Sequence, residues 1–323
     1  MKAVVLENPC TALDLVVREV PVPKVKPGWV LVKIKAFGIN RSEIFTRQGD
    51  SPSVELPRII GIECVGEIAD PSDSSLQKGQ RVVSLMGGLG RDFDGSYAEY
   101  ALIPTTQVYA INNKMDWVNL AAVPEMYYTA YASLFDTLML KKEDVLLIRG
   151  GTSSVGLAAL QLAKSIGTSV ISTSRNKGKL ELLKQHGADF VLVDDENMQT
   201  QLHSIFPQGV NKILELVGTV TLKNSFSMLT EKGILCMTGI LGGEWVLENF
   251  EPMVDIPSGS YFTQFDSGAN FKEKLLTELF DHIGKSNIQV PIAKVFTLNE
   301  ISQAHLLMEN NSANGKIVVI NPE

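Results

Sequence analysis

The stretch from Asp144 to Arg175 constrains the fold more than any other part of this sequence. It opens with a short apolar run, Val145–Ile148, and continues with the glycine-rich segment Gly150–Gly156. Apolar residues then recur at helical spacing until Gly167, a residue type that commonly ends helices, and a second apolar run follows. Strand, glycine turn, helix and strand within about thirty residues predict a β-α-β unit with parallel strands.

The turn within this unit is suited to a phosphate group. Backbone amides in the first turn of a helix have no intrahelical acceptor, and the helix macrodipole makes that end positive. A pyrophosphate binds there when small side chains leave room for it. The usual Gly-x-Gly-x-x-Gly pattern appears here with serine in place of the middle glycine. We therefore predict a dinucleotide site rather than an ordinary strand-to-helix turn, with contacts from Gly151, Thr152, Ser153, Ser154, Val155 and Gly156.

The end of the second strand distinguishes the two nicotinamide cofactors. Enzymes that use NAD commonly place Asp or Glu there to bind the ribose 2′-hydroxyl. This chain has Ser174 and Arg175 instead, followed by Lys177 and Lys179. A guanidinium forms a forked, charge-assisted contact with a 2′-phosphate. The pattern favours NADPH, with Ser174, Arg175 and Lys179 among the cofactor-binding residues; the alternative is a solvated basic start of a helix.

Composition argues against several other classes of protein. The 323 residues are 45% hydrophobic, enough for two domains with sizeable cores. A formal net charge of −7 argues against nucleic acid or an anionic membrane surface as a partner. We expect no membrane span and no signal peptide, because no apolar run is long enough for either. Three well-separated cysteines, Cys10, Cys64 and Cys236, suit a reducing compartment, so we expect a cytoplasmic protein.

The remaining sequence predicts an α/β protein of two domains. Short strands at 3–6, 15–20, 30–36, 59–68, 81–85 and 98–103 place a partly open β-barrel in residues 1–120. Residues 121–267 begin with a long helix over 121–140 and then alternate strands with helices, which predicts a doubly wound parallel sheet. Tyr261–Phe265 is the candidate for its sixth strand. Residues 268–323 are expected to fold back onto the first domain.

The chain resembles the medium-chain dehydrogenase/reductase superfamily, and within it the zinc-independent quinone oxidoreductases. The motifs that carry the resemblance are Gly38-Ile-Asn-Arg-Ser-Glu43, Gly61-Ile-Glu-Cys-Val-Gly66, Lys78-Gly-Gln-Arg-Val82, Gly95-Ser-Tyr-Ala-Glu99, Thr129-Ala-Tyr131, the glycine turn and Gly315-Lys-Ile-Val-Val319. Their order and spacing run over nearly the whole chain. The resemblance implies a GroES-like β-barrel domain, a Rossmann domain, and a cleft between them for the nicotinamide and the substrate.

The same resemblance implies a site without metal. The zinc alcohol dehydrogenases hold a catalytic ion by Cys, His and Cys, and the matching positions here are Asn40, Ile62 and Glu125. Isoleucine has no lone pair, and an amide is a poor zinc ligand. The lobe that carries structural zinc is also missing, because residues 83–97 contain no cysteine.

The candidate catalytic residues follow from this comparison. Asn40 takes the place of a metal ligand, and its amide could donate to a substrate oxygen or a cofactor ribose; the alternative is a loop asparagine bonded to its own backbone. Ser42 matches a hydroxyl that relays protons in the alcohol dehydrogenases, although Phe45 cannot continue that relay. Arg47 is expected to be structural, and Glu125 is either a buried acid or a helix cap. The resemblance adds Asn40, Thr129 and Gly239 to the cofactor contacts.

The expected activity is NADPH-dependent reduction of a quinone or an α,β-unsaturated carbonyl compound, which needs no strong Lewis acid. Two alternatives stay open: an enoyl-thioester reductase, and a non-catalytic NADPH-binding protein of the crystallin type. Relatives commonly dimerise through the outermost Rossmann strand, so we also expect a homodimer through the edge at Ser260–Phe265. The four histidines lie away from every motif and are expected to be surface or core residues.

Overall fold

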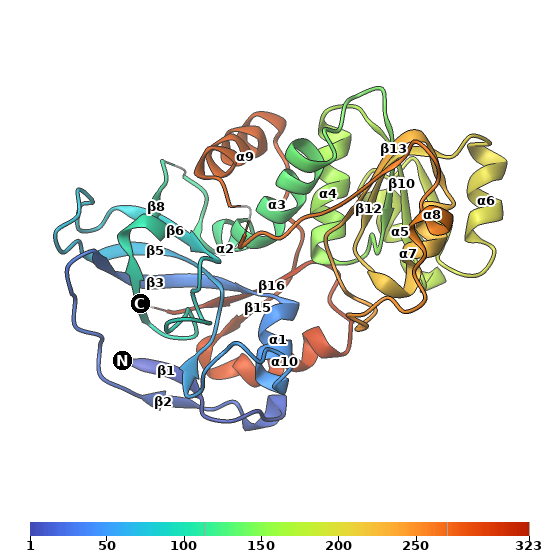
Figure 1. Cartoon of the computed structure of the whole chain (residues 1–323). Helices are drawn as coiled ribbons and strands as arrows, with labels where there is room; N and C mark the ends of the chain where they lie inside the picture. Colours follow the sequence, from blue (N-terminus) through green and yellow to red (C-terminus); the bar gives the residue numbers. More distant parts are fainter. Residues whose placement is uncertain (113, 270, 323) are drawn as a thin grey trace. The chain divides into compact units, whose positions relative to one another are not determined.

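The computed structural model describes residues 1–112, 114–269 and 271–322. The chain divides into two compact units, the first formed by Met1–Glu125 with Val290–Glu323 and the second by Met126–Gln289. Figure 1 shows the C-terminal strands β15 (Ile292–Thr297) and β16 (Lys316–Ile320), in red, beside the N-terminal strand β3 (Trp29–Ile39), in blue.

The first unit is mainly β-structure. Its strands are β1 (Lys2–Leu6), β2 (Val17–Glu19), β3 (Trp29–Ile39), β4 (Arg58–Ile59), β5 (Glu63–Asp70), β6 (Arg81–Leu85), β7 (Tyr100–Pro104), β8 (Tyr109–Ala110), β15 (Ile292–Thr297) and β16 (Lys316–Ile320). They form a three-stranded sheet in the order β2-β1-β4 and a seven-stranded sheet in the order β15-β16-β3-β5-β6-β8, with β7 also on β3.

The predicted GroES-like α/β organisation is confirmed, but these sheets do not close into a barrel. The long strand β3 pairs with β5 along one edge, and its other edge is shared between β7 and β16. This division ends the path at β8 and β15, which do not pair with each other among the residues described. A single bridge, Ala3 to Ala98, connects the two sheets. The unit is therefore a pair of open sheets around a common core.

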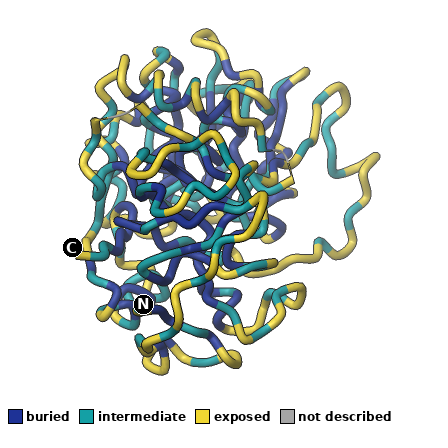
Figure 2. The backbone as a smooth tube through the Cα atoms, turned by 90° about the vertical axis from the view of Figure 1, so that its left-hand side faces the viewer, coloured by how far each residue is buried: buried dark blue, intermediate teal, exposed yellow. Residues whose placement is uncertain are grey.

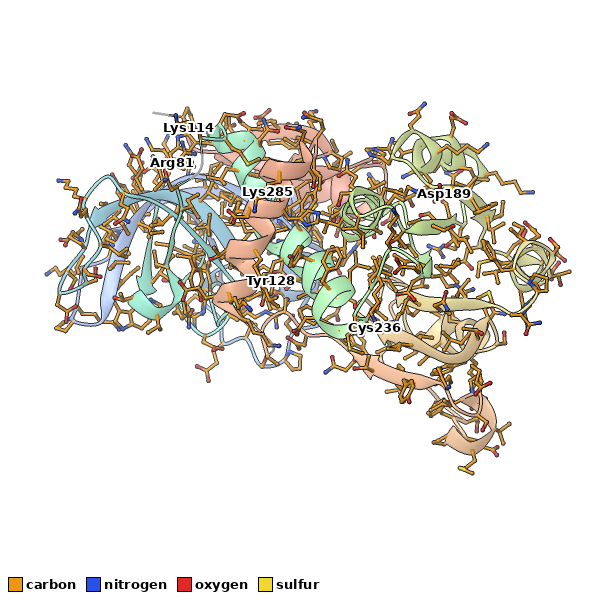
Figure 3. The ribbon with its side chains drawn as sticks, turned by 90° about the horizontal axis from the view of Figure 1, so that it is seen from above. Arg81, Lys114, Tyr128, Asp189, Cys236 and Lys285 are labelled. Atoms are coloured by element: carbon orange, nitrogen blue, oxygen red, sulfur yellow. The ribbon has the colours of Figure 1, made fainter. Side chains whose placement is uncertain are left out.

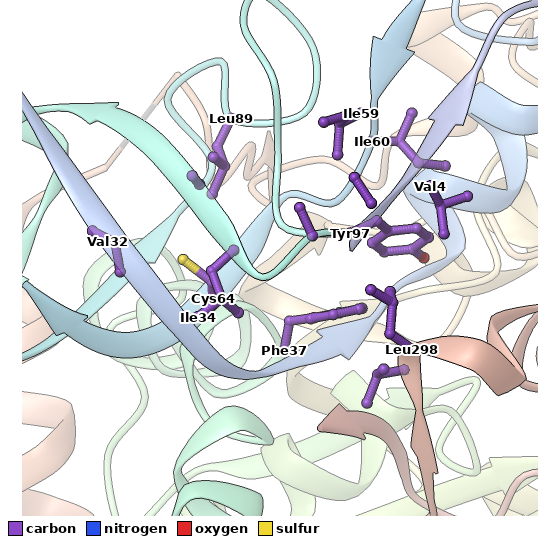
Figure 4. Packing of buried hydrophobic residues seen from close by; sticks show 14 of the residues in the cluster. Val4, Val32, Ile34, Phe37, Ile59, Ile60, Cys64, Leu89, Tyr97 and Leu298 are labelled. Carbon is purple, nitrogen blue, oxygen red and sulfur yellow. The ribbon is translucent and has the colours of Figure 1, made fainter. Parts of the chain in front are cut away.

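Buried apolar side chains from both sheets fill that core (Figure 4). Figure 2 colours the backbone by burial and shows the buried stretches, in dark blue, among the exposed ones, in yellow. The rings of Phe37 and Tyr97 stack with their centroids 4.9 Å apart, and Leu89 packs into the same cluster. The hydroxyl of Tyr97 lies 2.8 Å from Nε2 of His305, which is fully buried. Burial lowers the pKa of His305 to about 3, so this is a neutral core histidine.

Short helices complete the first unit: η1 (Ala12–Asp14), α1 (Arg41–Gln48), η2 (Thr105–Gln107), α2 (Trp117–Ala121), η5 (Leu298–Glu300) and α10 (Ile301–Glu309). Helix α10 lies beside α1 (Figure 1), and Arg47 of α1 forms a buried ion pair with Glu309 of α10. This contact between two surface-covering helices agrees with the structural role expected for Arg47.

The second unit contains a six-stranded sheet with every strand parallel. The strands are β9 (Val145–Arg149), β10 (Ser169–Ser174), β11 (Phe190–Val193), β12 (Val210–Glu215), β13 (Leu229–Met237) and β14 (Tyr261–Gln264). Their order, β11-β10-β9-β12-β13-β14, is the 3-2-1-4-5-6 order of the Rossmann fold. The doubly wound sheet and its sixth strand are thus as predicted.

The helices of this unit are α3 (Pro124–Tyr131), η3 (Ala132–Thr137), α4 (Ser154–Ser165), η4 (Lys177–Lys179), α5 (Leu180–Gln185), α6 (Met198–Ile205), α7 (Thr219–Phe226), α8 (Pro252–Asp255) and α9 (Glu273–Ser286). Apolar residues of α6 and α7 pack on one face of the sheet, and α4 contacts β9 and β10. Strand β13 carries the buried thiol of Cys236 (Figure 3). None of the described helices has the length and apolar character needed to cross a membrane.

The second unit extends beyond residue 267, where the sequence places the start of the C-terminal segment. Helix α9 belongs to this unit because its apolar side chains Leu275, Leu276, Leu279 and Ile283 are buried. At its start, Lys272 forms an ion pair with Asp136 at 2.7 Å, and along it His282 lies 2.6 Å from the hydroxyl of Ser165. Amphipathic spacing identified a helix here, but it did not indicate which domain the helix covers.

Candidate active site

The predicted dinucleotide turn has the conformation that a phosphate site needs. Gly150 has a φ of +85° and turns the chain out of β9 toward α4. Ser153 then caps α4: its Oγ accepts a bond from the Gly156 N–H at 3.0 Å and donates to the Gly150 carbonyl at 2.8 Å. The amides of Ser154 and Val155 lie in the same first turn, where a helix has no acceptor of its own. These amides can bind an anion.

Close packing explains the glycines of this turn. A Cβ on Gly156 would lie 2.6 Å from the Gly150 carbonyl oxygen and 2.7 Å from Cα of Gly151, so any side chain would push α4 away from the strand. A Cβ on Gly151 would collide with the side chain of Ser172 on β10. The replacement of the middle glycine by Ser153 is tolerated because this side chain turns inward to cap the helix. The residues present therefore fit a dinucleotide phosphate.

The residues after β10 form a polar, basic corner. Ser174 is buried, and its Oγ accepts a bond from the Asn176 N–H at 3.2 Å. Arg175 is exposed and forms no ion pair with any residue that the structure describes. Lys179 is half-buried at the end of η4, with its N–H bonded to the Asn176 carbonyl. The chain thus turns sharply after Ser174 and presents the Arg175 guanidinium to solvent.

Thr129 and Gly239 lie toward the same end of the sheet as the glycine turn. Gly239 follows β13, and its N–H bonds to the carbonyl of Glu215 at the end of β12. Ser133, one helical turn after Thr129, bonds to the hydroxyl of Thr238 at 3.0 Å. The carboxyl ends of parallel strands are where open α/β sheets bind ligands. In the second unit, the predicted cofactor residues that follow β9, β10 and β13 therefore lie at the carboxyl ends of the parallel strands.

A buried ion pair supports this edge, and our sequence interpretation did not identify it. The Arg149 guanidinium, at the end of β9, binds Asp194 after β11 with Nη2 to Oδ1 at 2.6 Å. Its Nη1 donates to Ser225, whose hydroxyl in turn donates to Glu215 at 2.5 Å. Burial raises the pKa of Glu215, although the Ser225 bond opposes the shift. The network joins the ends of β9, β11 and β12.

In the first unit, Asn40 begins helix α1. Its backbone N–H donates to Glu43 Oε2 at 3.0 Å, and Glu43 Oε1 accepts a bond from the Ile62 N–H at 3.1 Å. Glu43 is fully buried, and this burial raises its pKa to about 7 even though the bond from Ile62 opposes the rise. Glu43 can therefore gain or lose a proton near neutral pH.

The side chain of Asn40 lies on a buried ion pair. Lys316 Nζ is 2.6 Å from Glu63 Oε1, and both residues have no exposed surface. Lys316 also donates to Asn40 Oδ1 at 2.5 Å, while Asn40 Nδ2 donates to Glu63 Oε1 at 2.9 Å. Because an ammonium only donates and a carboxylate only accepts, these partners fix which end of the amide is oxygen. Gly38 leaves room for the pair, since a Cβ there would lie 2.9 Å from Lys316 Nζ.

This geometry differs from the donor role expected for Asn40. Nδ2 is directed at Glu63, with Glu43 Oε1 a further 3.4 Å contact, so the amide protons face carboxylates within the protein. Asn40 instead links α1 to β5 and β16, and its Oδ1 is the atom that retains a lone pair for a hydroxyl.

Ser42 lies one residue before Glu43 and accepts a bond from Arg91. The distance from Arg91 Nη2 to Ser42 Oγ is 2.6 Å. Arg91 belongs to the loop between β6 and β7, in the segment where the alcohol dehydrogenases carry their structural-zinc lobe. Phe45 follows one turn along α1, so the hydroxyl of Ser42 has no proton-carrying side chain at that position. The Ser42 hydroxyl is therefore in contact with a cation.

The donor set in this region does not fit zinc. Among the described residues, no group of three or more His, Cys, Asp or Glu side chains is placed to hold a metal ion. Asn40 is held by the ion pair, and Ile62 contributes only its backbone. Glu125 is buried in the first turn of α3, and its N–H donates to Glu63 Oε2 at 2.8 Å. Glu63 therefore accepts the hydrogen bond from the backbone amide at the start of α3.

Glu63, Lys316 and Arg91 are the site residues that sequence interpretation missed. Glu63 lies in the motif Gly61-Ile-Glu-Cys-Val-Gly66, and Lys316 lies in the motif Gly315-Lys-Ile-Val-Val319. Each is a charged residue beside apolar positions of a strand. A charge in a strand that is otherwise buried is seldom tolerated without a partner, and that pattern could have suggested the pair. Arg91 stands in an irregular loop, where no periodicity indicates what a side chain contacts.

Known proteins resemble this chain along most of its length. The alcohol dehydrogenase GroES-like domain matches residues 26–113, and the zinc-binding dehydrogenase domain matches residues 154–264. The quinone oxidoreductase of Lama guanicoe is 27% identical over 308 residues, which cover 94% of this chain and 92% of that protein. The quinone oxidoreductase of Pseudomonas syringae superposes with a TM-score of 0.89 at 20% identity and 99% coverage of both chains. A mycobacterial protein complexed with NADPH has a TM-score of 0.87 and 25% identity, covering 99% of this chain and 100% of its own.

The fold, the glycine turn and these matches define an oxidoreductase enzyme that uses a nicotinamide cofactor. The two matching domains are those of the medium-chain dehydrogenase/reductase superfamily, and over nearly its whole length the chain is similar to the quinone oxidoreductases of that superfamily.

We expect the variant Lys316→Met to destabilise the protein strongly. Removing one partner of a buried ion pair leaves an uncompensated charge, which typically costs about 3–5 kcal/mol. Urea unfolding followed by circular dichroism measures this loss. The double variant Glu63→Gln with Lys316→Met should recover part of it, because no unpaired charge remains. Arg18→Met, which removes an exposed ion pair with Glu7, is the control and should cost at most about 1 kcal/mol. Equal costs for Lys316→Met and Arg18→Met would contradict the assigned role.

Proposed function

We propose that this protein is an NADPH-dependent reductase that transfers hydride to a quinone or an α,β-unsaturated carbonyl compound without a metal ion. The observation that carries the proposal is that one chain combines two features. It has a Rossmann turn suited to phosphate, and it has Asn40 and Ile62 at positions where the zinc alcohol dehydrogenases carry metal ligands. The quinone oxidoreductases among the relatives support the substrate class.

The chemistry of conjugated acceptors suits such a site. NADPH, when bound, supplies the hydride. Reduction of an isolated carbonyl concentrates charge on one oxygen and needs a Lewis acid or strong donors there. In a quinone or enone the charge spreads over the conjugated system, so orientation and a few hydrogen bonds supply much of the rate. The glycine turn binds and orients the cofactor phosphates, and Ser42 is a polar, partly exposed residue of the first unit that can donate a hydrogen bond to a substrate oxygen.

The test of this function is steady-state oxidation of NADPH with a small panel of acceptors. We expect turnover with 1,4-benzoquinone and a cyclic enone, and none with a simple aliphatic ketone. Chelators should leave the rate unchanged, and elemental analysis should find no stoichiometric zinc, because the donor set does not fit the ion. Turnover confined to enoyl thioesters would favour the enoyl-thioester reductase, and tight NADPH binding with no turnover would favour the binding protein.

The proposed preference for NADPH depends on the end of β10. Arg175 is exposed and has no acidic partner within residues 1–112, 114–269 and 271–322, and Ser174 stands where NAD enzymes carry an acidic residue. A carboxylate there would repel the 2′-phosphate of NADPH, whereas a guanidinium attracts it. Lys179 adds a second positive charge on the following turn. The mycobacterial relative complexed with NADPH agrees with this choice.

The variant Arg175→Ala should weaken NADPH binding much more than NADH binding. Only NADPH carries the phosphate that Arg175 is proposed to contact, and a charge-assisted contact contributes roughly 1.5–3 kcal/mol, or about ten- to a hundredfold in Kd. Fluorescence titration of both cofactors measures the two affinities. Lys184→Ala, on the far end of α5, is the matched control and should leave both values within about twofold. An equal loss for the two cofactors would exclude this role for Arg175.

We further propose that the protein is a cytoplasmic homodimer joined through β14. The three free cysteines agree with a reducing compartment. Strand β14 is the edge of its sheet, and its residues Tyr261 and Phe262 are 59% and 39% exposed. The segment before β14, which includes α8, exposes further apolar side chains: Trp245, Val246, Met253 and Val254. A bare apolar edge invites pairing, and a twofold copy of itself would satisfy its amides.

Proline at position 263 tests the dimer. Thr263→Pro should shift the protein toward monomer or aggregate if Thr263 donates its N–H across the edge. The control Thr297→Pro, at the end of β15 in the first unit, should leave the mass in solution unchanged. Multi-angle light scattering at micromolar concentration gives the mass directly. A wild-type monomer under these conditions would refute the dimer.

A further inference from the structure

The loop between β6 and β7 places a guanidinium on the first turn of α1. Arg91 Nη2 donates to Ser42 Oγ at 2.6 Å, and Arg91 Nε is buried without a hydrogen-bond acceptor among the described residues. Ser42 is partly exposed, two residues after Asn40. Because Arg91 occupies an acceptor position on the Ser42 oxygen, the hydroxyl proton of Ser42 is available to donate elsewhere.

The loop that carries Arg91 is anchored on both sides. Leu89 is fully buried in the core of the first unit (Figure 4). Gly90 packs against Gly61 so closely that a Cβ would lie 2.6 Å from the Gly61 nitrogen. The Met86 N–H bonds to the Ile62 carbonyl at 2.7 Å, and the Arg91 N–H bonds to the Gly88 carbonyl at 2.9 Å. The backbone of the loop thus holds Arg91 close to the segment that contains Gly61 and Ile62.

The charge of Arg91 is not neutralised by a carboxylate of the described chain. Four other arginines have such a partner: Arg18 binds Glu7, Arg47 binds Glu309, Arg58 binds Asp94 and Arg149 binds Asp194. The acidic neighbour Asp94 is taken by Arg58 and by the Ile59 N–H. Arg91 instead donates a hydrogen bond to the neutral hydroxyl of Ser42. A cation without a counter-ion beside a donor hydroxyl is an arrangement that stabilises a negatively charged oxygen.

We propose that Arg91 and Ser42 together bind the carbonyl oxygen of the acceptor substrate and stabilise the negative charge that develops on it. This inference rests on the proposed function and extends it, because it assigns the electrophilic role that zinc has in the alcohol dehydrogenases to a guanidinium and a hydroxyl of this chain. The ligand class is a conjugated ketone or quinone whose oxygen becomes an enolate or a phenolate.

The electrons and protons of the reduction balance with this assignment. Hydride adds to the β-carbon of an enone, the C=C π pair moves toward the carbonyl, and the nicotinamide is oxidised by two electrons. The substrate oxygen then carries one negative charge, which the Ser42 O–H and the Arg91 guanidinium meet with hydrogen bonds. One proton from solvent completes the saturated ketone. For a quinone, the same hydride and one proton give the hydroquinone.

The first test uses binding alone. 4-Nitrophenolate carries its charge on an oxygen of a conjugated ring, and calorimetry measures its affinity for the protein with oxidised cofactor present. Arg91→Gln should weaken it about tenfold or more, Ser42→Ala less, and Arg91→Lys should restore part of it, since a charged hydrogen bond is worth about ten- to a hundredfold. Arg18→Gln is the control because it removes an exposed arginine of the same unit. Equal phenolate affinities for Arg91→Gln and Arg18→Gln, or no phenolate binding by the wild type, would overturn the proposal.

The second test compares two substrates that differ in how strongly their reduction depends on stabilising negative charge on the substrate oxygen. Arg91→Gln should lower kcat/KM by about a hundredfold for a cyclic enone and by less for benzoquinone, since one oxyanion donor contributes about 10²–10³ in rate. Its NADPH affinity and its urea midpoint should match the wild type, which a merely structural role would not predict. Turnover that is unchanged by Arg91→Gln would overturn this inference alone. Phenolate binding through Arg91 without turnover of either acceptor would support the oxygen site and refute the proposed function.

Discussion

The buried ion pair of Glu63 and Lys316 is the interaction on which the segment from Gly38 to Glu43 depends. Two charges are removed from water, a change that is favourable only if each finds a full set of partners. Glu63 uses one oxygen for Lys316 and Asn40 and the other for the amide at the start of α3. Lys316 also holds the Asn40 oxygen. One pair thereby fixes β5, β16 and the start of two helices, and it requires the missing side chain of Gly38.

The second unit solves a related problem at the ends of its strands. The first-turn amides of Ser154 and Val155 have no acceptor within the helix and can bind an anion, while Arg149, Asp194 and Glu215 form a buried network at the ends of the neighbouring strands. Charges within the protein hold the strand ends, and neutral dipoles are left for the ligand. Phosphate binding by backbone amides requires this division, because a carboxylate at the surface of the turn would repel the ligand.

These two arrangements explain how an oxidoreductase site can exist in this chain without metal ligands. The amide of Asn40 is engaged with Glu63 and Lys316 within the protein. The positive charge that meets Ser42 comes instead from Arg91, on a loop held by Leu89 and Gly90. Burial that raises the pKa of Glu43 to about 7 belongs to the same region. Polar groups of the first unit are thus organised by hydrogen bonding to one another, with Ser42 and Arg91 at the margin.

The sequence by itself determined the periodic and local features of this protein. The β-α-β unit, its glycine turn and the parallel sheet follow from spacing, because strands and helices impose their periods on neighbouring residues. The strand expected over 59–68 is divided into β4 and β5, and helix α1 lies in a stretch for which the sequence predicted no helix. Only the tertiary structure decided that the sheets stay open, that α9 joins the second unit, and that Lys316 meets Glu63 and Arg91 meets Ser42. Such contacts join residues far apart in the chain, and no local period encodes them.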